Sequence, residues 1–176
     1  MELNAETIKS FVNSPRDTAR ENELKRELRL LPEQERFAFI QTCFNITGYR
    51  NGGLGLLLAS SCLHSKTYIL PLLEKGLISA DASTIRFWLE FALPRLGEHN
   101  TFTILFDLLE TNPEVVGKAL YWLPSLLKTE TKMLGELQRL QSLAEAKGVI
   151  RKPVIIPDPK NEGRVLFGNI YAIEDT

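Results

Sequence analysis

The feature that most constrains the fold of this chain is a pattern of apolar residues that occurs twice in its middle. In the second half of the pattern, residues 30 positions apart match: Ile85 with Val115, Leu89 with Ala119, Leu93 with Leu123, Pro94 with Pro124, and Leu96 with Leu126. In the first half the offset is 36: Ile69 with Leu105, Leu72 with Leu108, Leu73 with Leu109, and Glu74 with Glu110. A weaker third copy begins at Leu54. Apolar residues three or four positions apart share one face of an α-helix, so each copy predicts two helices joined by a turn.

A helix pair of this kind exposes an apolar stripe that it cannot bury alone, whereas stacked pairs bury a continuous core. We therefore expect an all-α fold, a right-handed stack of antiparallel helix pairs. Pro94 and Pro124 stand late in the second helix of each copy. Because proline removes one backbone hydrogen bond, it is expected to kink or end that helix.

Helical periodicity extends on both sides of the two copies. It predicts further helices over 3–12, around Leu24 and Leu28, from Pro32-Glu33 to about Phe44, over 54–63 and over 132–146. Gly48 and the Asn51-Gly52-Gly53 cluster predict a turn, and Gly76 is expected to end the helix that starts near Tyr68. Asn112 and Pro113 are typical residues for the start of a helix.

Two segments resemble the HEAT and armadillo class of helical repeats. The run Tyr68 to Leu73, a turn, and a second helix that opens with Ile85-Arg86 follow that pattern, and Asp107 to Val115 is similar to the family's turn. The resemblance covers about residues 66–128, although the spacing is shorter than in that family and Val116 stands where an arginine is expected. It implies an α-solenoid scaffold that binds another macromolecule, and it implies no catalytic residues.

Composition narrows the function classes. The 176 residues include 44% hydrophobic and 24% charged side chains, which is ordinary for a globular protein. Net charge is −1 and no long segment has a basic excess, which argues against nucleic-acid binding.

Cys43 and Cys62 lie in apolar runs and are expected in the core. The N-terminus lacks the pattern of a signal peptide, and the apolar run 54–63 is too short to span a bilayer, so we expect a cytoplasmic protein.

No motif for a cofactor, a metal or a catalytic group stands out, and we expect none of them. The run Gly52-Gly53-Leu54-Gly55 lacks the lysine and hydroxyl residue of a phosphate-binding loop. His64 and His99 have no serine, cysteine or carboxylate partner at a catalytic spacing, and we expect both in exposed turns.

Aromatic side chains concentrate on the two matched second helices, as Phe87, Trp88, Phe91, Tyr121 and Trp122. Aromatic residues at helical spacing usually belong to the core. However, residues 85, 89, 93 and 96 already form an inward stripe, so the second apolar side could face a partner. Arg86 and Glu90 are four residues apart and can form an ion pair. Because aromatic and arginine side chains dominate binding hot spots, the candidate partner-binding residues are Arg86, Trp88, Glu90, Tyr121 and Trp122.

The composition changes after Gly148, which divides the chain into a helical-repeat domain, 1–148, and a tail, 149–176. The tail is rich in β-branched residues and contains three prolines between 153 and 159. It predicts a β-hairpin or an extended segment that packs on the helices and caps their apolar face, or adds its edge to a partner strand.

Together these features predict a non-catalytic protein–protein interaction module, either a small adaptor or an inhibitor or immunity-type binder. One alternative is a HEAT-like protein that acts on nucleic acid, as the HEAT-like DNA glycosylases do. Another is an enzyme whose site is assembled from distant residues.

Overall fold

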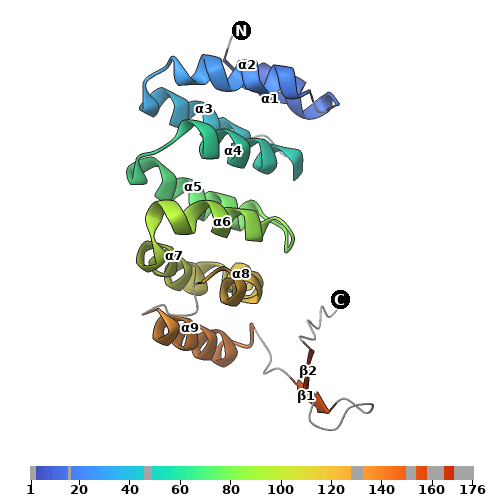
Figure 1. Ribbon diagram of the computed structural model, residues 1–176, viewed down its shortest axis with the longest axis vertical. Helices are drawn as coiled ribbons and strands as arrows, with labels where there is room; N and C mark the ends of the chain where they lie inside the picture. Colours follow the sequence, from blue (N-terminus) through green and yellow to red (C-terminus); the bar gives the residue numbers. More distant parts are fainter. Residues whose placement is uncertain are drawn as a thin grey trace.

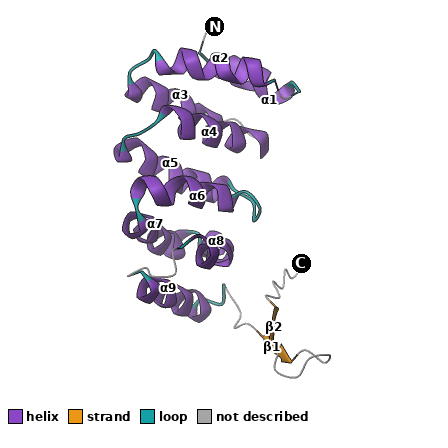
Figure 2. Cartoon of the chain, in the orientation of Figure 1, coloured by secondary structure: helices purple, strands orange, loops and turns teal. Residues whose placement is uncertain are grey.

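The computed structural model describes residues 3–15, 17–45, 49–127, 133–149, 154–157 and 165–168. These residues include nine helices: α1 (Ala5–Asn13), α2 (Thr18–Arg29), α3 (Glu33–Asn45), α4 (Tyr49–Cys62), α5 (Lys66–Ser79), α6 (Ile85–Leu96), α7 (Glu98–Thr111), α8 (Pro113–Leu126) and α9 (Leu134–Ala146). The helices form a repeat-like array in which each one packs on its neighbours, and Figures 1 and 2 show them stacked in chain order along the long axis. The expectation of an all-α array is therefore confirmed for the described helical part.

The helices follow one another as antiparallel pairs, α1–α2, α3–α4, α5–α6 and α7–α8, followed by α9. The last three pairs pack directly within the pair, whereas α1 and α2 pack mainly on α3 and α4. In Figure 1 the turns within the first and third pairs lie at one edge of the stack, and the turns between pairs lie at the opposite edge. The second helices also contact one another across pairs, since α4 packs on α2 and α6, and α6 packs on α8. A residue on α6 can therefore meet a residue on α8 on the same side of the array.

The repeat register agrees with the observed burial. Both members of the following matched pairs are buried: Ile69 and Leu105, Leu72 and Leu108, Leu73 and Leu109, Ile85 and Val115, Leu89 and Ala119. In the last two matched pairs one member is buried and the other half-buried: Leu123 is buried and Leu93 half-buried, and Leu96 is buried and Leu126 half-buried. Cys43 and Cys62 are free thiols with no exposed surface, as expected for core residues, and burial raises the pKa of the Cys43 thiol to about 12.

The glycine clusters were predicted to interrupt helices, and this is wrong for the described residues. Gly52 and Gly53 lie inside α4, and Gly76 lies inside α5. Gly76 is buried against the indole ring of Trp88, so close that a Cβ atom there would overlap the ring. Its role is thus to let α5 approach α6, not to end α5. Gly48 lies outside the described residues.

α2 begins at Thr18, and Asp17 caps it by accepting the N–H groups of Ala19 and Arg20. One further boundary differs from the sequence expectation. His99 lies in the first turn of α7 and not in a loop, because the chain reverses at a single residue, Gly97, whose φ of 81° suits glycine.

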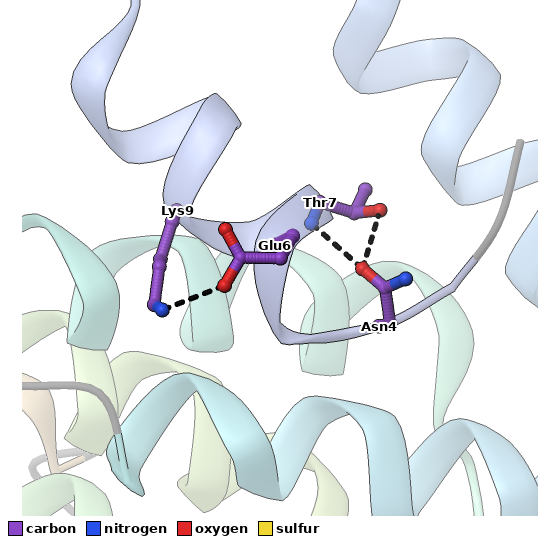
Figure 3. Close-up of polar contacts among 4 residues, drawn as sticks. All are labelled: Asn4, Glu6, Thr7 and Lys9. Atoms are coloured by element: carbon purple, nitrogen blue, oxygen red, sulfur yellow. Dashed lines mark hydrogen bonds and ion pairs between the residues drawn. The ribbon is translucent and has the colours of Figure 1, made fainter.

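Local signals do explain other helix ends. At the start of α1, Asn4 Oδ1 accepts hydrogen bonds from the Thr7 backbone N–H at 3.0 Å and from the Thr7 hydroxyl at 3.2 Å, and Lys9 pairs with Glu6 at 2.7 Å (Figure 3). An N-cap of this kind satisfies amide groups that have no partner inside the helix. Pro94 and Pro124 lie inside α6 and α8, and each helix ends two residues later.

Arginines from three helices hold the end of α4. The last carbonyls of a helix lack partners within it and form the negative end of its dipole, so cations stabilise them. The donors come from α6, α2 and α3 in turn: Arg95 Nη2 to the Ser60 carbonyl at 3.1 Å, Arg29 Nε to the Ser61 carbonyl at 3.3 Å, and Arg36 Nη1 to the Cys62 carbonyl at 3.1 Å. These bonds link the first three pairs at one corner of the array.

Two short strands lie in the tail, β1 (Val154–Pro157) and β2 (Val165–Gly168), and they pair antiparallel with Val154 opposite Gly168. The predicted contacts of residues 149–176 with the helices depend on side chains that lie largely outside the described part of the chain. The division at residue 148 and the capping role of the tail thus stay predictions.

Candidate partner-binding surface

The five residues predicted to bind a partner come from two neighbouring helices. Arg86, Trp88 and Glu90 lie on α6, and Tyr121 and Trp122 lie on α8, which packs directly on α6. In the sequence the two groups are more than 30 residues apart. The stacking of the third and fourth pairs places α6 and α8 side by side (Figure 1).

Trp88 is a core residue. Its side chain is 2% exposed and lies over Gly76, and its ring centroid is 5.6 Å from that of Phe44 and 5.9 Å from that of Phe91. It therefore contributes packing between α3, α5 and α6 and offers no accessible surface to a partner. The other four candidates are at least partly exposed.

Arg86 connects α6 to α8. Its Nε donates a hydrogen bond to Glu90 Oε1 at 2.7 Å, which is the ion pair that the four-residue spacing predicted. Its guanidinium carbon lies 5.3 Å from the centre of the Trp122 ring, within the range of a cation–π contact. The arginine is thus held by a carboxylate from its own helix and by an aromatic face from the next repeat.

Trp122 is fixed in turn by the chain before α6. Its indole Nε1 donates to the backbone carbonyl of Ala82 at 2.9 Å, and the Tyr121 ring meets the indole edge-on with centroids 4.9 Å apart. Tyr121 keeps 50% of its surface exposed. Arg86, Glu90, Tyr121 and Trp122 therefore form one connected group, the α6–α8 cluster.

Asp81 orders the turn that carries Ala82. Its carboxylate Oδ1 accepts bonds from the backbone N–H groups of Ser83 and Thr84, at 2.9 and 2.8 Å, and from both hydroxyl groups. These donors stabilise the charged form and hold the pKa of Asp81 well below its usual value, at about 2. The turn that positions Trp122 is thus built by local hydrogen bonds from the Asp-Ala-Ser-Thr sequence.

The structure also has a groove that was not predicted from the sequence, and none of the cluster residues lines it. It has a volume of about 880 Å³, and α1, α2, α4, the α5–α6 turn and the start of α6 contribute to its lining. Phe87, which is 52% exposed, forms part of its wall, and Gly52 and Gly53 lie along α4 within it. The sequence pattern placed these glycines in a turn. Inside a helix they have no side chain, which leaves open space along α4, and the groove was therefore not predicted.

The described residues offer little for acid–base or metal chemistry. His64 and His99 are both exposed, and no group of three or more His, Cys, Asp or Glu side chains in the described part could hold a metal ion. Glu33 has a lowered pKa because it accepts the backbone N–H groups of His64 and Ser65, at 2.6 and 2.8 Å. This carboxylate caps the start of α5, which is a structural role.

The described helices define a repeat-like array of antiparallel pairs, with an exposed cluster where the third and fourth pairs meet. Comparisons with protein-family models, with curated protein sequences and with solved structures found no match. The likeness to HEAT and armadillo repeats therefore remains a resemblance in pattern. No helix among the described residues is both long enough and apolar enough to cross a membrane.

Proposed function

We propose that this chain is a non-catalytic protein-interaction module that binds one protein partner through the α6–α8 cluster. The observation that carries the proposal is the meeting of an exposed arginine, a tyrosine and a tryptophan from two repeats. Tryptophan, tyrosine and arginine are the residue types most enriched in binding hot spots. Half of the Tyr121 surface is exposed to water in the chain alone, and a bound partner would cover it.

The cluster has the rigidity that favours binding. Each member contacts another member, and Trp122 is also bonded to the Ala82 carbonyl, so little side-chain freedom remains to be lost on association. Within this proposal the array is a right-handed α-solenoid of the HEAT type, the protein acts in the cytoplasm, and it needs no cofactor. An adaptor and an inhibitor or immunity-type binder are both compatible with such a surface.

The test is affinity purification of the full chain from cells that express it, followed by mass spectrometry of the bound proteins. Tyr121→Ala and Arg86→Ala each remove one exposed member of the cluster. The matched control is Leu143→Ala, which truncates a side chain on α9 that is 40% exposed. We expect a specific partner that is retained by the wild type and the control and lost by both cluster variants. A partner set that is unchanged in the cluster variants would contradict the proposal.

A further inference from the structure

The Arg86 guanidinium is oriented from two directions. Glu90 Oε1 accepts the hydrogen bond from Nε at 2.7 Å, which fixes one edge of the planar group, and the guanidinium carbon lies over the Trp122 ring, 5.3 Å from its centre. Trp122 cannot move freely, because its own Nε1 is bonded to the Ala82 carbonyl at 2.9 Å. The third side of the guanidinium, which carries Nη1 and Nη2, has no hydrogen-bond acceptor among the described residues, and the side chain is 48% exposed.

The free side has the geometry of a receptor for an oxyanion. Nη1 and Nη2 present two N–H donors in one plane, and this fork matches the two oxygens of a carboxylate or phosphate. The donors are already oriented by Glu90 and Trp122, so binding would restrict few additional torsions.

We propose that Arg86 is the receptor for a carboxylate side chain of the protein partner, an Asp or Glu held by paired bonds to Nη1 and Nη2. The inference rests on the proposed function and specifies the chemistry of the partner. A phosphate group is disfavoured because it carries close to two negative charges and would lie near the Glu90 carboxylate. A single carboxylate is repelled less strongly, while it still gains both charge-assisted bonds.

The residue next to this carboxylate in the partner is apolar. Tyr121 continues the row from Arg86 through Trp122, and its ring is half exposed. Phe87, which directly follows Arg86 in the sequence, is also 52% exposed. The site thus fits an acidic side chain flanked by an aliphatic or aromatic one, because both exposed rings need apolar cover to leave water.

The chain carries a built-in reporter for this contact. It has two tryptophans, and only Trp122 belongs to the cluster, while Trp88 is buried in the core. In a ¹H–¹⁵N NMR spectrum of the full chain the two indole N–H signals report the site and the core separately. The probe is the peptide acetyl-Gly-Glu-Leu-Gly-amide, and its Gln counterpart differs only in the charged group.

We expect the Glu peptide to shift the Trp122 indole signal and the Arg86 Nε–H signal in a saturable way, with the Trp88 signal unchanged. The Gln peptide should bind about tenfold more weakly, which is the usual loss when a hydrogen bond to a charged group is removed. Inorganic phosphate should bind more weakly than the Glu peptide.

Arg86→Lys keeps the positive charge and removes the planar fork, so the roughly tenfold preference for Glu over Gln should fall severalfold without disappearing. The matched control is Arg139→Lys on α9. Arg139 also lies over an aromatic ring, Phe106 at 4.9 Å, but its Nη1 is already 3.6 Å from Glu136. This control should bind the peptide as the wild type does.

Equal binding of the two peptides, an unchanged preference in Arg86→Lys, or tighter binding of phosphate would overturn the inference. So would the absence of any saturable shift at millimolar peptide. These outcomes are separable from a failure of the proposed function. A cellular partner that is lost with Tyr121→Ala and kept with Arg86→Lys would leave the module intact and refute only the carboxylate receptor.

Discussion

At the scale of single residues, the glycines show that the same residue type has opposite roles in neighbouring helices. Gly76 in α5 has the Trp88 indole ring in the space that a Cβ atom would occupy. Gly53 in α4 has no atom within 4 Å of that position. A glycine inside a helix costs about 1 kcal/mol relative to alanine. The close contact with Trp88 explains this cost at Gly76, whereas no contact explains it at Gly53.

Gly76→Ala is expected to lower the free energy of unfolding by about 1–3 kcal/mol, because both Gly76 and Trp88 are buried and the ring cannot shift without disturbing the core. Gly53→Ala is the matched control and should raise it by about 0.5–1 kcal/mol through helix propensity. Urea unfolding followed by circular dichroism measures both. Stabilisation by Gly76→Ala would mean that α5 and α6 are farther apart than described.

The two ordered carboxylates Glu33 and Asp81 lead to a prediction about acid stability. Both have a lower pKa in the folded chain than in the unfolded chain, because they accept backbone N–H bonds at the start of α5 and in the turn before α6. A lowered pKa stabilises the fold above the unfolded value, near 4, and this stabilisation is lost as the pH falls through the folded value. For Asp81 the loss should extend down to about pH 2.

We therefore expect the urea midpoint to decline between pH 5 and pH 2, and the decline to be shallower in Asp81→Asn and in Glu33→Gln. Asp17→Asn is a suitable control, since asparagine also caps helices well and this carboxylate is exposed. If all three variants followed the wild-type curve, the hydrogen bonds to Glu33 and Asp81 would contribute nothing measurable to stability.

At the scale of helices, the repeat register makes Leu89 of α6 equivalent in position to Ala119 of α8, and Leu93 equivalent to Leu123. Leu89 and Leu123 are fully buried. Each therefore contributes to the continuous core of the array, in which α6 packs on α8 and α8 packs on α9.

Leu89→Ala and Leu123→Ala are each expected to cost about 2–5 kcal/mol of unfolding free energy, the range for leucines removed from a packed core. Leu143→Ala serves as the control at an exposed position of α9, and its effect should stay within about 0.5 kcal/mol. Thermal or urea unfolding gives the values. Losses below about 1 kcal/mol in both core variants would show that the repeat register is wrong.

At the scale of the whole molecule, charge separates the proposed function from the nucleic-acid alternative. The 21 basic and 22 acidic side chains nearly balance. Several arginines are also engaged inside the array, since Arg29, Arg36 and Arg95 donate to the end of α4. Fewer cations are then available for phosphate contacts than the sequence count suggests.

Mixed-sequence DNA and RNA are therefore expected not to bind the full chain at micromolar concentration in physiological salt. Fluorescence anisotropy with labelled oligonucleotides, measured between 50 and 200 mM salt, is the appropriate assay. Micromolar binding that weakens steeply with salt would indicate several phosphate contacts and would favour the nucleic-acid alternative.

The sequence by itself determined most of the helices and the register of the repeat, because both follow from the spacing of apolar residues within about 15 positions. Helix ends are also marked locally: Asn4 accepts a backbone hydrogen bond at the start of α1, Pro113 is the first residue of α8, and Gly148 has a positive φ after α9. The ion pair between Arg86 and Glu90 was also predictable, since four residues make one turn of a helix.

Only the tertiary structure decided which aromatic side chains are buried and which meet at the surface. Trp88 and Trp122 both lie on second helices with similar apolar patterns, yet the first packs over Gly76 and the second lies at the surface, bonded to Ala82. Likewise, Gly52 and Gly53 line a groove rather than form a turn. These outcomes depend on contacts between residues 10 to 40 positions apart, which spacing along one helix does not encode.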